Sequence, residues 1–139
     1  MSKIAGSCLC GAIKYASTVE PVMVAVCHCT HCQKQSGGAF SVNVAIPKGS
    51  LQVTSGRTTV FQDAGSSGQP VYRHFCSTCG SPIYSDVVAT PQLDWLKAGT
   101  LDDTSWIKPV ANIWCESAQN WVVYPEGVPR FPQNPPATS

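Results

Sequence analysis

The sequence predicts a mostly β domain built from several small antiparallel sheets, with only a few short helical turns. Residues 39–46 alternate in character, and this period of two would place Phe40, Val42, Val44 and Ile46 on one face of a half-buried strand. Eleven glycines and eleven prolines are spread along the chain, which suits short strands joined by many turns. Seven of the eight cysteines fall into three tight clusters, two of them beside a glycine that favours a turn. A length of 139 residues corresponds to a single domain that can bury a core of its own.

The remaining elements follow in order along the chain. Alternation and β-prone composition predict further strands at residues 12–15, 51–54, 58–62, 71–75 and 82–85. Residues 47–49 and 64–68 should form a turn and a loop, and the last two strands should form a hairpin around a C-x-x-C turn. Short helical pieces are expected at residues 31–36 and near 91–96. The proline-rich segment 129–139 should lie extended on the surface or be disordered.

Composition excludes several classes of function. The formal net charge is +1, only 12% of residues are charged, and no basic run exists, so no nucleic-acid partner is expected. No apolar stretch has the length of a membrane span. Residues 1–6 contain no apolar signal-peptide core, and clustered reduced thiols suit a reducing compartment, so we expect a cytoplasmic protein.

The cysteine clusters carry the chemistry. Their members are Cys8 and Cys10, then Cys27, Cys29 and Cys32, and finally Cys76 and Cys79. Thiolates two or three residues apart can turn toward one point and share a metal ion, and zinc is the ion that best suits tetrahedral thiolate sites. Two pairs together offer four ligands, which is a closed and typically structural set. The triplet offers three, which leaves a position open for chemistry.

Spacing alone does not decide which cysteines share a metal. A zinc shared by the first and last pairs would close a long loop, where a crosslink should contribute most. The fourth position at the triplet could hold water, a ligand thiol or a side chain from elsewhere in the chain. Cys115 is a candidate for that side chain, although a small buried residue between Trp114 and Glu116 is the more common role for such a cysteine.

Other interpretations of the cysteines stay open at this stage. They could form the disulfide framework of a small secreted protein. All three clusters could hold structural zinc, with His28 or His31 as a fourth ligand at the triplet, in a non-catalytic zinc-binding module. A reductase with Cys115 as its redox nucleophile would need a lowered thiol pKa and a resolving thiol.

A zinc ion on three thiolates carries a net charge of −1, and this charge lowers its Lewis acidity. Such a centre suits the binding of a soft ligand, for example a substrate thiolate, better than the polarisation of a carbonyl group. The residues therefore favour thiol chemistry over hydrolysis. Gly37 and Gly38, which follow the triplet, form a loop that a ligand could approach closely or that simply turns the chain.

At these motifs the sequence resembles the glutathione-dependent formaldehyde-activating enzyme (GFA) family, which includes centromere protein V. The matching blocks are G-S-C-L-C-G at 6–11, C-H-C-T-H-C-Q-K at 27–34, S-G-G-A-F at 36–40, H-F-C-S-T-C-G at 74–80 and A-G-T-L-D-D at 98–103. The resemblance spans residues 6–131, and these blocks in this order are highly specific. It departs from the family pattern at Asn112, where many members carry a histidine.

The resemblance implies a zinc-pinned β-tent fold, similar to zinc ribbons, over residues 1–131, followed by a proline-rich tail at 132–139. It implies two zinc ions per chain. A structural ion would bind Cys8, Cys10, Cys76 and Cys79, and an open, catalytic-type ion would bind Cys27, Cys29 and Cys32. The implied activity is that of a carbon–sulfur lyase that joins glutathione to formaldehyde as S-hydroxymethylglutathione. Lys34, Arg57 and Arg73 are candidates to hold the two carboxylates of glutathione.

Overall fold

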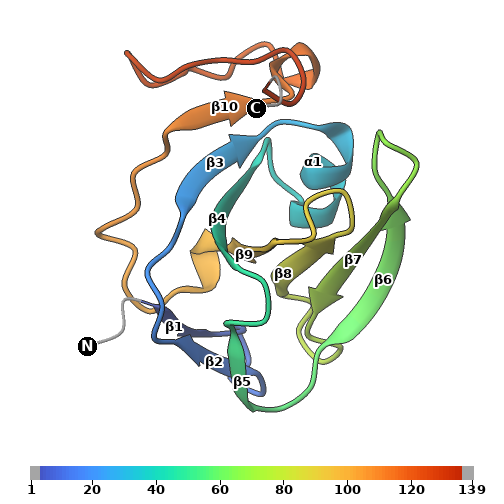
Figure 1. Cartoon of the computed structure of the whole chain (residues 1–139), viewed down its shortest axis with the longest axis vertical. Coiled ribbons are helices and arrows are strands. Elements are labelled where there is room, and N and C mark those ends of the chain that lie inside the picture. The colour runs from blue at the N-terminus through green and yellow to red at the C-terminus, as the bar shows by residue number, and fades with distance from the viewer. Residues whose placement is uncertain (1–3, 136–139) are drawn as a thin grey trace.

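The computed structural model describes residues 4–135 (Figure 1). Residues 1–3 and 136–139, the latter being the end of the predicted tail, lie outside the described residues. The strands are β1 (Ile4–Ser7), β2 (Lys14–Ser17), β3 (Met23–Cys27), β4 (Ser41–Pro47), β5 (Gln52–Ser55), β6 (Thr59–Ala64), β7 (Pro70–Phe75), β8 (Pro82–Val87), β9 (Leu93–Lys97) and β10 (Ala111–Ile113). The helices are α1 (Thr30–Ser36) and the short 3-10 helices η1 (Ala98–Thr100) and η2 (Cys115–Ser117).

The strands form two sheets, which confirms the predicted mostly β class. The smaller sheet has the order β1-β2-β5, and the larger has the order β10-β3-β4-β9-β8-β7-β6. Neighbouring strands are antiparallel except β10, which pairs with β3 in parallel. Figure 1 shows α1 beside the larger sheet and the smaller sheet at the opposite end of the molecule from β10.

Two sequence predictions are wrong. The helical piece expected near residues 91–96 is instead strand β9, which lies between β4 and β8 inside the larger sheet. Pairing on both edges outweighs the weak local preference of such a short segment. Strand β4 is not half-buried either, because Asn43 and Ala45 are as fully buried as Val44 and Ile46. Both faces of this central strand are therefore covered.

One face of the larger sheet packs into the apolar core. Val24, Val44 and Leu96 stand opposite one another on β3, β4 and β9, and all three are buried. They belong to one hydrophobic cluster with Ile4 and Tyr15 of the smaller sheet. Burial of these side chains, at about 1.5–3 kcal/mol each, holds the two sheets together.

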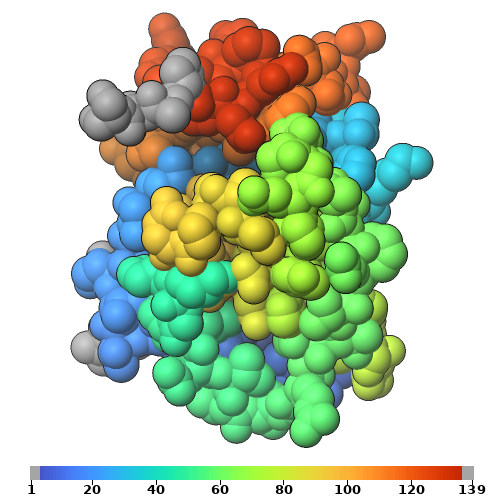
Figure 2. All heavy atoms as spheres, turned by 45° about the vertical axis from the view of Figure 1, so that its right-hand side comes forward, coloured from blue at the N-terminus to red at the C-terminus, as the bar shows by residue number. Residues whose placement is uncertain are grey.

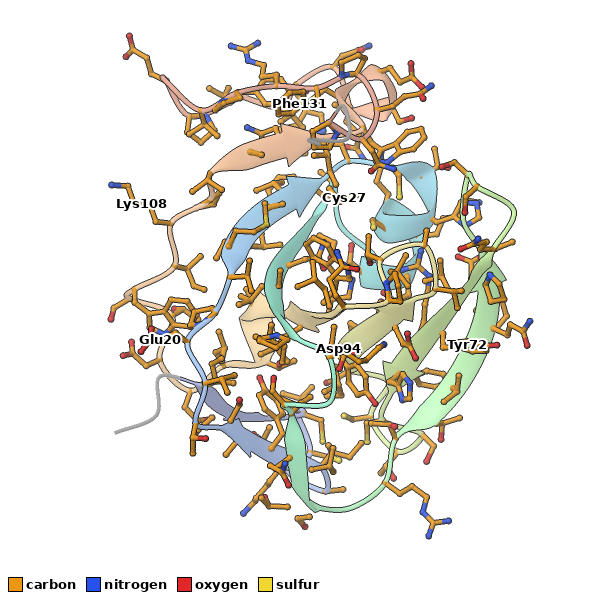
Figure 3. The ribbon with its side chains drawn as sticks, viewed as in Figure 1. Glu20, Cys27, Tyr72, Asp94, Lys108 and Phe131 are labelled. Atoms are coloured by element: carbon orange, nitrogen blue, oxygen red, sulfur yellow. The ribbon has the colours of Figure 1, made fainter. Side chains whose placement is uncertain are left out.

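The other face of the same strands carries a group of polar side chains near the end of β3, and this group positions the site. Cys27 on β3 stands opposite Ser41 on β4, and Asn43, two residues further on, stands opposite Lys97 on β9. Directly opposed residues and residues two apart share a face of a sheet, so these four side chains lie together. Figure 3 shows Cys27 at the end of β3, next to α1.

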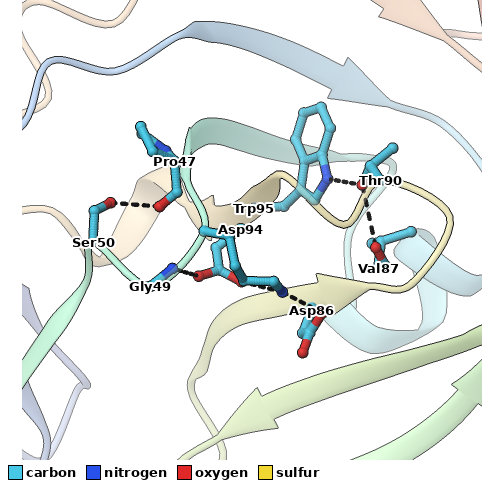
Figure 4. A network of polar contacts seen from close by, with 9 residues as sticks. Pro47, Gly49, Ser50, Asp86, Val87, Thr90, Asp94 and Trp95 are labelled. Carbon is cyan, nitrogen blue, oxygen red and sulfur yellow. Dashed lines mark hydrogen bonds and ion pairs between the residues drawn. The ribbon is translucent and has the colours of Figure 1, made fainter.

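An ion-pair network joins the C-terminal ends of β4 and β8 to the N-terminal end of β9 (Figure 4). Lys48 Nζ donates to Asp94 Oδ1 at 2.9 Å and also contacts Asp86, while the backbone N–H of Gly49 donates to Asp94 Oδ2 at 3.1 Å. Asp94 is buried, so these contacts compensate for the removal of its carboxylate from water.

The C-terminal segment covers the β10 end of the molecule (Figure 2). The backbone N–H groups of Asn112 and Phe131 donate to Pro129 O and Asn112 O, both at 2.8 Å, and fix this segment along β10. None of the helices among residues 4–135 has the length and apolar character needed to cross a membrane.

Candidate metal centres

The structure brings Cys8, Cys10, Cys76 and Cys79 together, with their Sγ atoms all within 4.8 Å of one another. Two similar tight turns present them, one between β1 and β2 and the other between β7 and β8. Each turn ends with a glycine at φ +81°, Gly11 or Gly80, whose backbone N–H donates to the carbonyl of the first cysteine of its pair. A side chain at such φ would be strained, which explains the glycine at both positions.

The donor set fits a tetrahedral metal ion. The Cys8–Cys10 and Cys10–Cys76 sulfur distances are 3.6 and 3.8 Å. Zn–S bonds of about 2.3 Å in a tetrahedron imply sulfur separations of about 3.8 Å. Every one of these cysteines is free rather than disulfide-bonded. Hydrogen bonds from the side chain and backbone of Ser81 lower the pKa of Cys79 to about 5, which favours the thiolate that a metal needs.

A second cluster consists of Cys27, Cys29 and Cys32, whose sulfurs also lie within 4.8 Å of one another. Cys27 ends β3, Cys29 is the N-cap of α1, and Cys32 lies in the first turn of that helix. The backbone N–H of Cys32 donates to Cys29 Sγ at 3.2 Å, so this sulfur also caps the helix. Three sulfurs converge here, with no histidine or carboxylate of the described residues as a fourth donor.

The electrostatics of this cluster favour shared negative charge. Contacts with Cys27 and Cys29, together with the positive charges of Lys97 and Arg73, lower the pKa of Cys32 to about 2. The contacts with Cys29 and Cys32 raise the pKa of Cys27. One proton is therefore readily lost from the group of three, as a metal-binding thiol cluster requires.

A surface hollow of about 410 Å³ lies between α1, the helix that carries Cys32, and the strands β6 and β7. Its lining residues are His31, Lys34, Gln35, Phe61, Asp63 and Arg73. In Figure 2 the pale blue atoms of α1 border the green atoms of β6. Arg73 Nε donates to Asp63 Oδ2 at 2.9 Å, and His31 Nδ1 lies 2.7 Å from the same oxygen. Burial raises the pKa of Asp63, but these two partners outweigh it and lower the pKa.

The histidines beside the three cysteines point elsewhere. His28 is buried between the rings of Phe40 and Tyr124, and its Nε2 lies 3.3 Å from Asn112 Oδ1. Asn112, at the position where the resembling family often has histidine, is thus a partner of His28. His31 faces Asp63, so neither histidine joins the cluster as the fourth ligand considered from the sequence.

The other site residues predicted from the sequence lie outside the two sulfur clusters, and only some of them line the hollow. Of the three candidate cations, Lys34 and Arg73 line the hollow and Arg57 does not. Cys115 lies in η2, outside both sulfur clusters. Gly37 ends α1 with φ +72°, which accounts for its presence at that turn.

Sequence reasoning missed Lys97 and the two side chains that hold it. Lys97 is 7% exposed, and its Nζ donates to Ser41 Oγ at 3.0 Å and to Asn43 Oδ1 at 2.9 Å. Burial lowers the pKa of Lys97, and the nearby thiols oppose this effect. A lone lysine at the end of a short apolar segment is usually exposed, so no sequence signal identified it.

Comparisons with known proteins show similarity of this chain to one protein family, to a curated relative and to a solved structure. The family model described as "Glutathione-dependent formaldehyde-activating enzyme" matches residues 3–117. A protein of Halomonas elongata named "Putative glutathione-dependent formaldehyde-activating enzyme" is 29% identical over 122 residues, which covers 84% of this chain and 78% of the relative. A crystal structure of a Rhodobacter sphaeroides protein has a TM-score of 0.59 at 20% identity, covering 76% of this chain and 92% of that one, and shares the fold.

Proposed function

The chain belongs to the glutathione-dependent formaldehyde-activating enzyme family, and from this membership we propose that it is a zinc-dependent carbon–sulfur lyase acting on the adduct of a small thiol and an aldehyde. Glutathione or a related thiol would be the sulfur substrate, as in the formation of S-hydroxymethylglutathione. The observation that carries the proposal is the cluster of three cysteines, which has no fourth protein donor among the described residues. Helix α1, which carries Cys32, also lines a surface hollow.

Two zinc ions would have different tasks in this proposal. Cys8, Cys10, Cys76 and Cys79 would hold a structural ion that joins two distant turns. Cys27, Cys29 and Cys32 would hold the ion at which the thiol binds. The need for reduced thiols at both sites supports a cytoplasmic location.

The chain would bind and orient the thiol. Zinc at the three cysteines would supply a soft Lewis acid that favours the thiolate form of the incoming sulfur. Lys34 and Arg73 line the hollow beside α1 and would attract the carboxylates of a thiol such as glutathione. In the forward reaction the thiol loses its proton, a carbon–sulfur bond forms at the aldehyde carbon, and the carbonyl oxygen gains a proton.

We expect a chelator to remove the two metal ions in separate steps. The three-cysteine site has one protein ligand fewer and should release its metal first, while the four-cysteine site should hold its metal until the fold opens, because its binding energy is also folding energy. Titration with a mild chelator, followed by metal analysis and circular dichroism, measures both steps. A single zinc ion that is released only on unfolding would contradict the two-site proposal.

The central test of function uses cobalt as a spectroscopic probe. After mild chelation, cobalt is loaded into the three-cysteine site while zinc remains in the closed site. A small thiol should change the visible spectrum as the fourth ligand switches from oxygen to sulfur. The zinc-loaded protein should also speed the equilibration of glutathione with formaldehyde above the spontaneous rate, which exchange NMR measures against a Cys29→Ser control.

The outcomes separate the two candidate functions. A spectrum that ignores every thiol offered, with an exchange rate equal to that of the Cys29→Ser control, would replace the lyase proposal with a non-catalytic zinc-binding module. A thiol response without faster exchange would retain thiol binding and exclude formaldehyde as the aldehyde.

A further inference from the structure

Lys97 is a buried cation that no carboxylate of the described residues balances. Its Nζ donates to two neutral oxygens, Ser41 Oγ and Asn43 Oδ1, and none of the ion pairs found among residues 4–135 includes it. A buried ammonium group without an opposite charge is costly in free energy. Its position therefore calls for a source of negative charge nearby.

The three-cysteine cluster supplies that charge. Ser41 stands directly opposite Cys27 across β3 and β4, so the oxygen that accepts from Lys97 belongs to the residue facing a cluster member. Lys97 lies on the same face of the larger sheet as Cys27. Burial lowers the pKa of Lys97, and the three thiols, Cys32 most of all, oppose this effect. The other nearby cation, Arg73, also interacts with Cys32 but already pairs with Asp63.

We infer that Lys97 is a positioning residue that makes the three-cysteine centre prefer an anionic fourth ligand, an inference that rests on the proposed thiol chemistry. A divalent ion on three thiolates carries −1 whether or not water is bound. A thiolate in the fourth position makes the net charge of the centre −2. A fixed positive charge on the same face of the sheet stabilises this additional negative charge. The ammonium itself need not touch the ligand, because charges several ångströms apart still interact strongly in a protein interior.

Three substitutions test the charge apart from the packing. Lys97→Met removes the charge and keeps a long apolar side chain, whereas Lys97→Arg keeps the charge. Asn43→Asp leaves Lys97 in place and gives it a carboxylate partner of nearly unchanged shape at a contact that is now 2.9 Å long. Lys108→Met is the matched control, because Lys108 is exposed and lies far from Cys27 (Figure 3).

Titration of the cobalt-loaded protein with mercaptoethanol gives the dissociation constant of the thiol. We expect Lys97→Met and Asn43→Asp to raise it by about 10- to 100-fold, the range for the loss of one nearby charge, and Lys97→Arg and Lys108→Met to leave it within about threefold. Metal content of the four-cysteine site and the melting temperature show that the fold is intact. A merely structural role of Lys97 would lower the melting temperature of Lys97→Met without changing the dissociation constant of the thiol.

Equal thiol affinity in Lys97→Met and the wild type would overturn the inference and leave the proposed function standing. If Lys97→Met does not fold, Asn43→Asp decides in the same way. If the wild type ignores thiols, the proposed function fails, and titration with thiocyanate, a soft anion, decides the inference alone. Thiocyanate binding that weakens in Lys97→Met or Asn43→Asp supports it, and binding that is absent or indifferent to these changes overturns it.

Discussion

Cys76→Ser is expected to destabilise the fold by more than about 4 kcal/mol, the size of effect that accompanies loss of a structural metal. Cys76 is buried at 2% exposure, and its sulfur lies 3.8 Å from that of Cys10, which is 66 residues earlier in the chain. Removing it leaves three sulfurs that cannot complete a closed tetrahedron, and it releases the crosslink between the β1–β2 and β7–β8 turns. Urea unfolding of the metal-loaded proteins measures the change.

Cys115→Ser is the matched control for that experiment, because it makes the same replacement at a cysteine outside both clusters. We expect its free energy of unfolding to change by less than about 1 kcal/mol. A Cys76→Ser protein as stable as Cys115→Ser, with its metal content unchanged, would show that the four sulfurs do not hold a structural ion.

Cys29→Ser is expected to have the opposite profile, with a nearly normal fold and complete loss of metal at the three-cysteine site. Serine is among the best N-cap residues, so its hydroxyl can take over the hydrogen bond that Cys29 Sγ accepts from the Cys32 backbone. Two remaining thiols would not retain the ion, and thiol–formaldehyde exchange should fall to the spontaneous rate. Metal analysis, urea unfolding and exchange NMR on one sample measure all three properties.

Cys29→Ala separates the capping role from the metal role. It should lose the metal equally but cost a further 0.5–2 kcal/mol or so of stability, because alanine cannot cap α1. If Cys29→Ser unfolds as completely as Cys76→Ser, the three-cysteine site is structural and the lyase proposal loses its main support.

Much of the local structure could be predicted from the sequence. The hairpin around Cys76 and Cys79 forms at the expected place, as β7 and β8, because a cysteine turn with Gly80 fixes the chain locally. Helix α1 also lies where residues 31–36 predicted it. Strand β9 could not be predicted, because its five residues have no strong preference and their conformation comes from pairing with β4 and β8.

The family and the two kinds of cysteine group can be recognised from the sequence alone, because ligand spacing within a cluster is a local property of the chain. Cysteine spacing left open which groups come together, and the folded chain settles it, since contacts between residues 66 positions apart depend on how the sheets pack. It also placed Lys97 opposite Asn43 and on the same face of the larger sheet as Cys27. Strand register brings those side chains together, and register follows from the pairing of whole strands rather than from any motif.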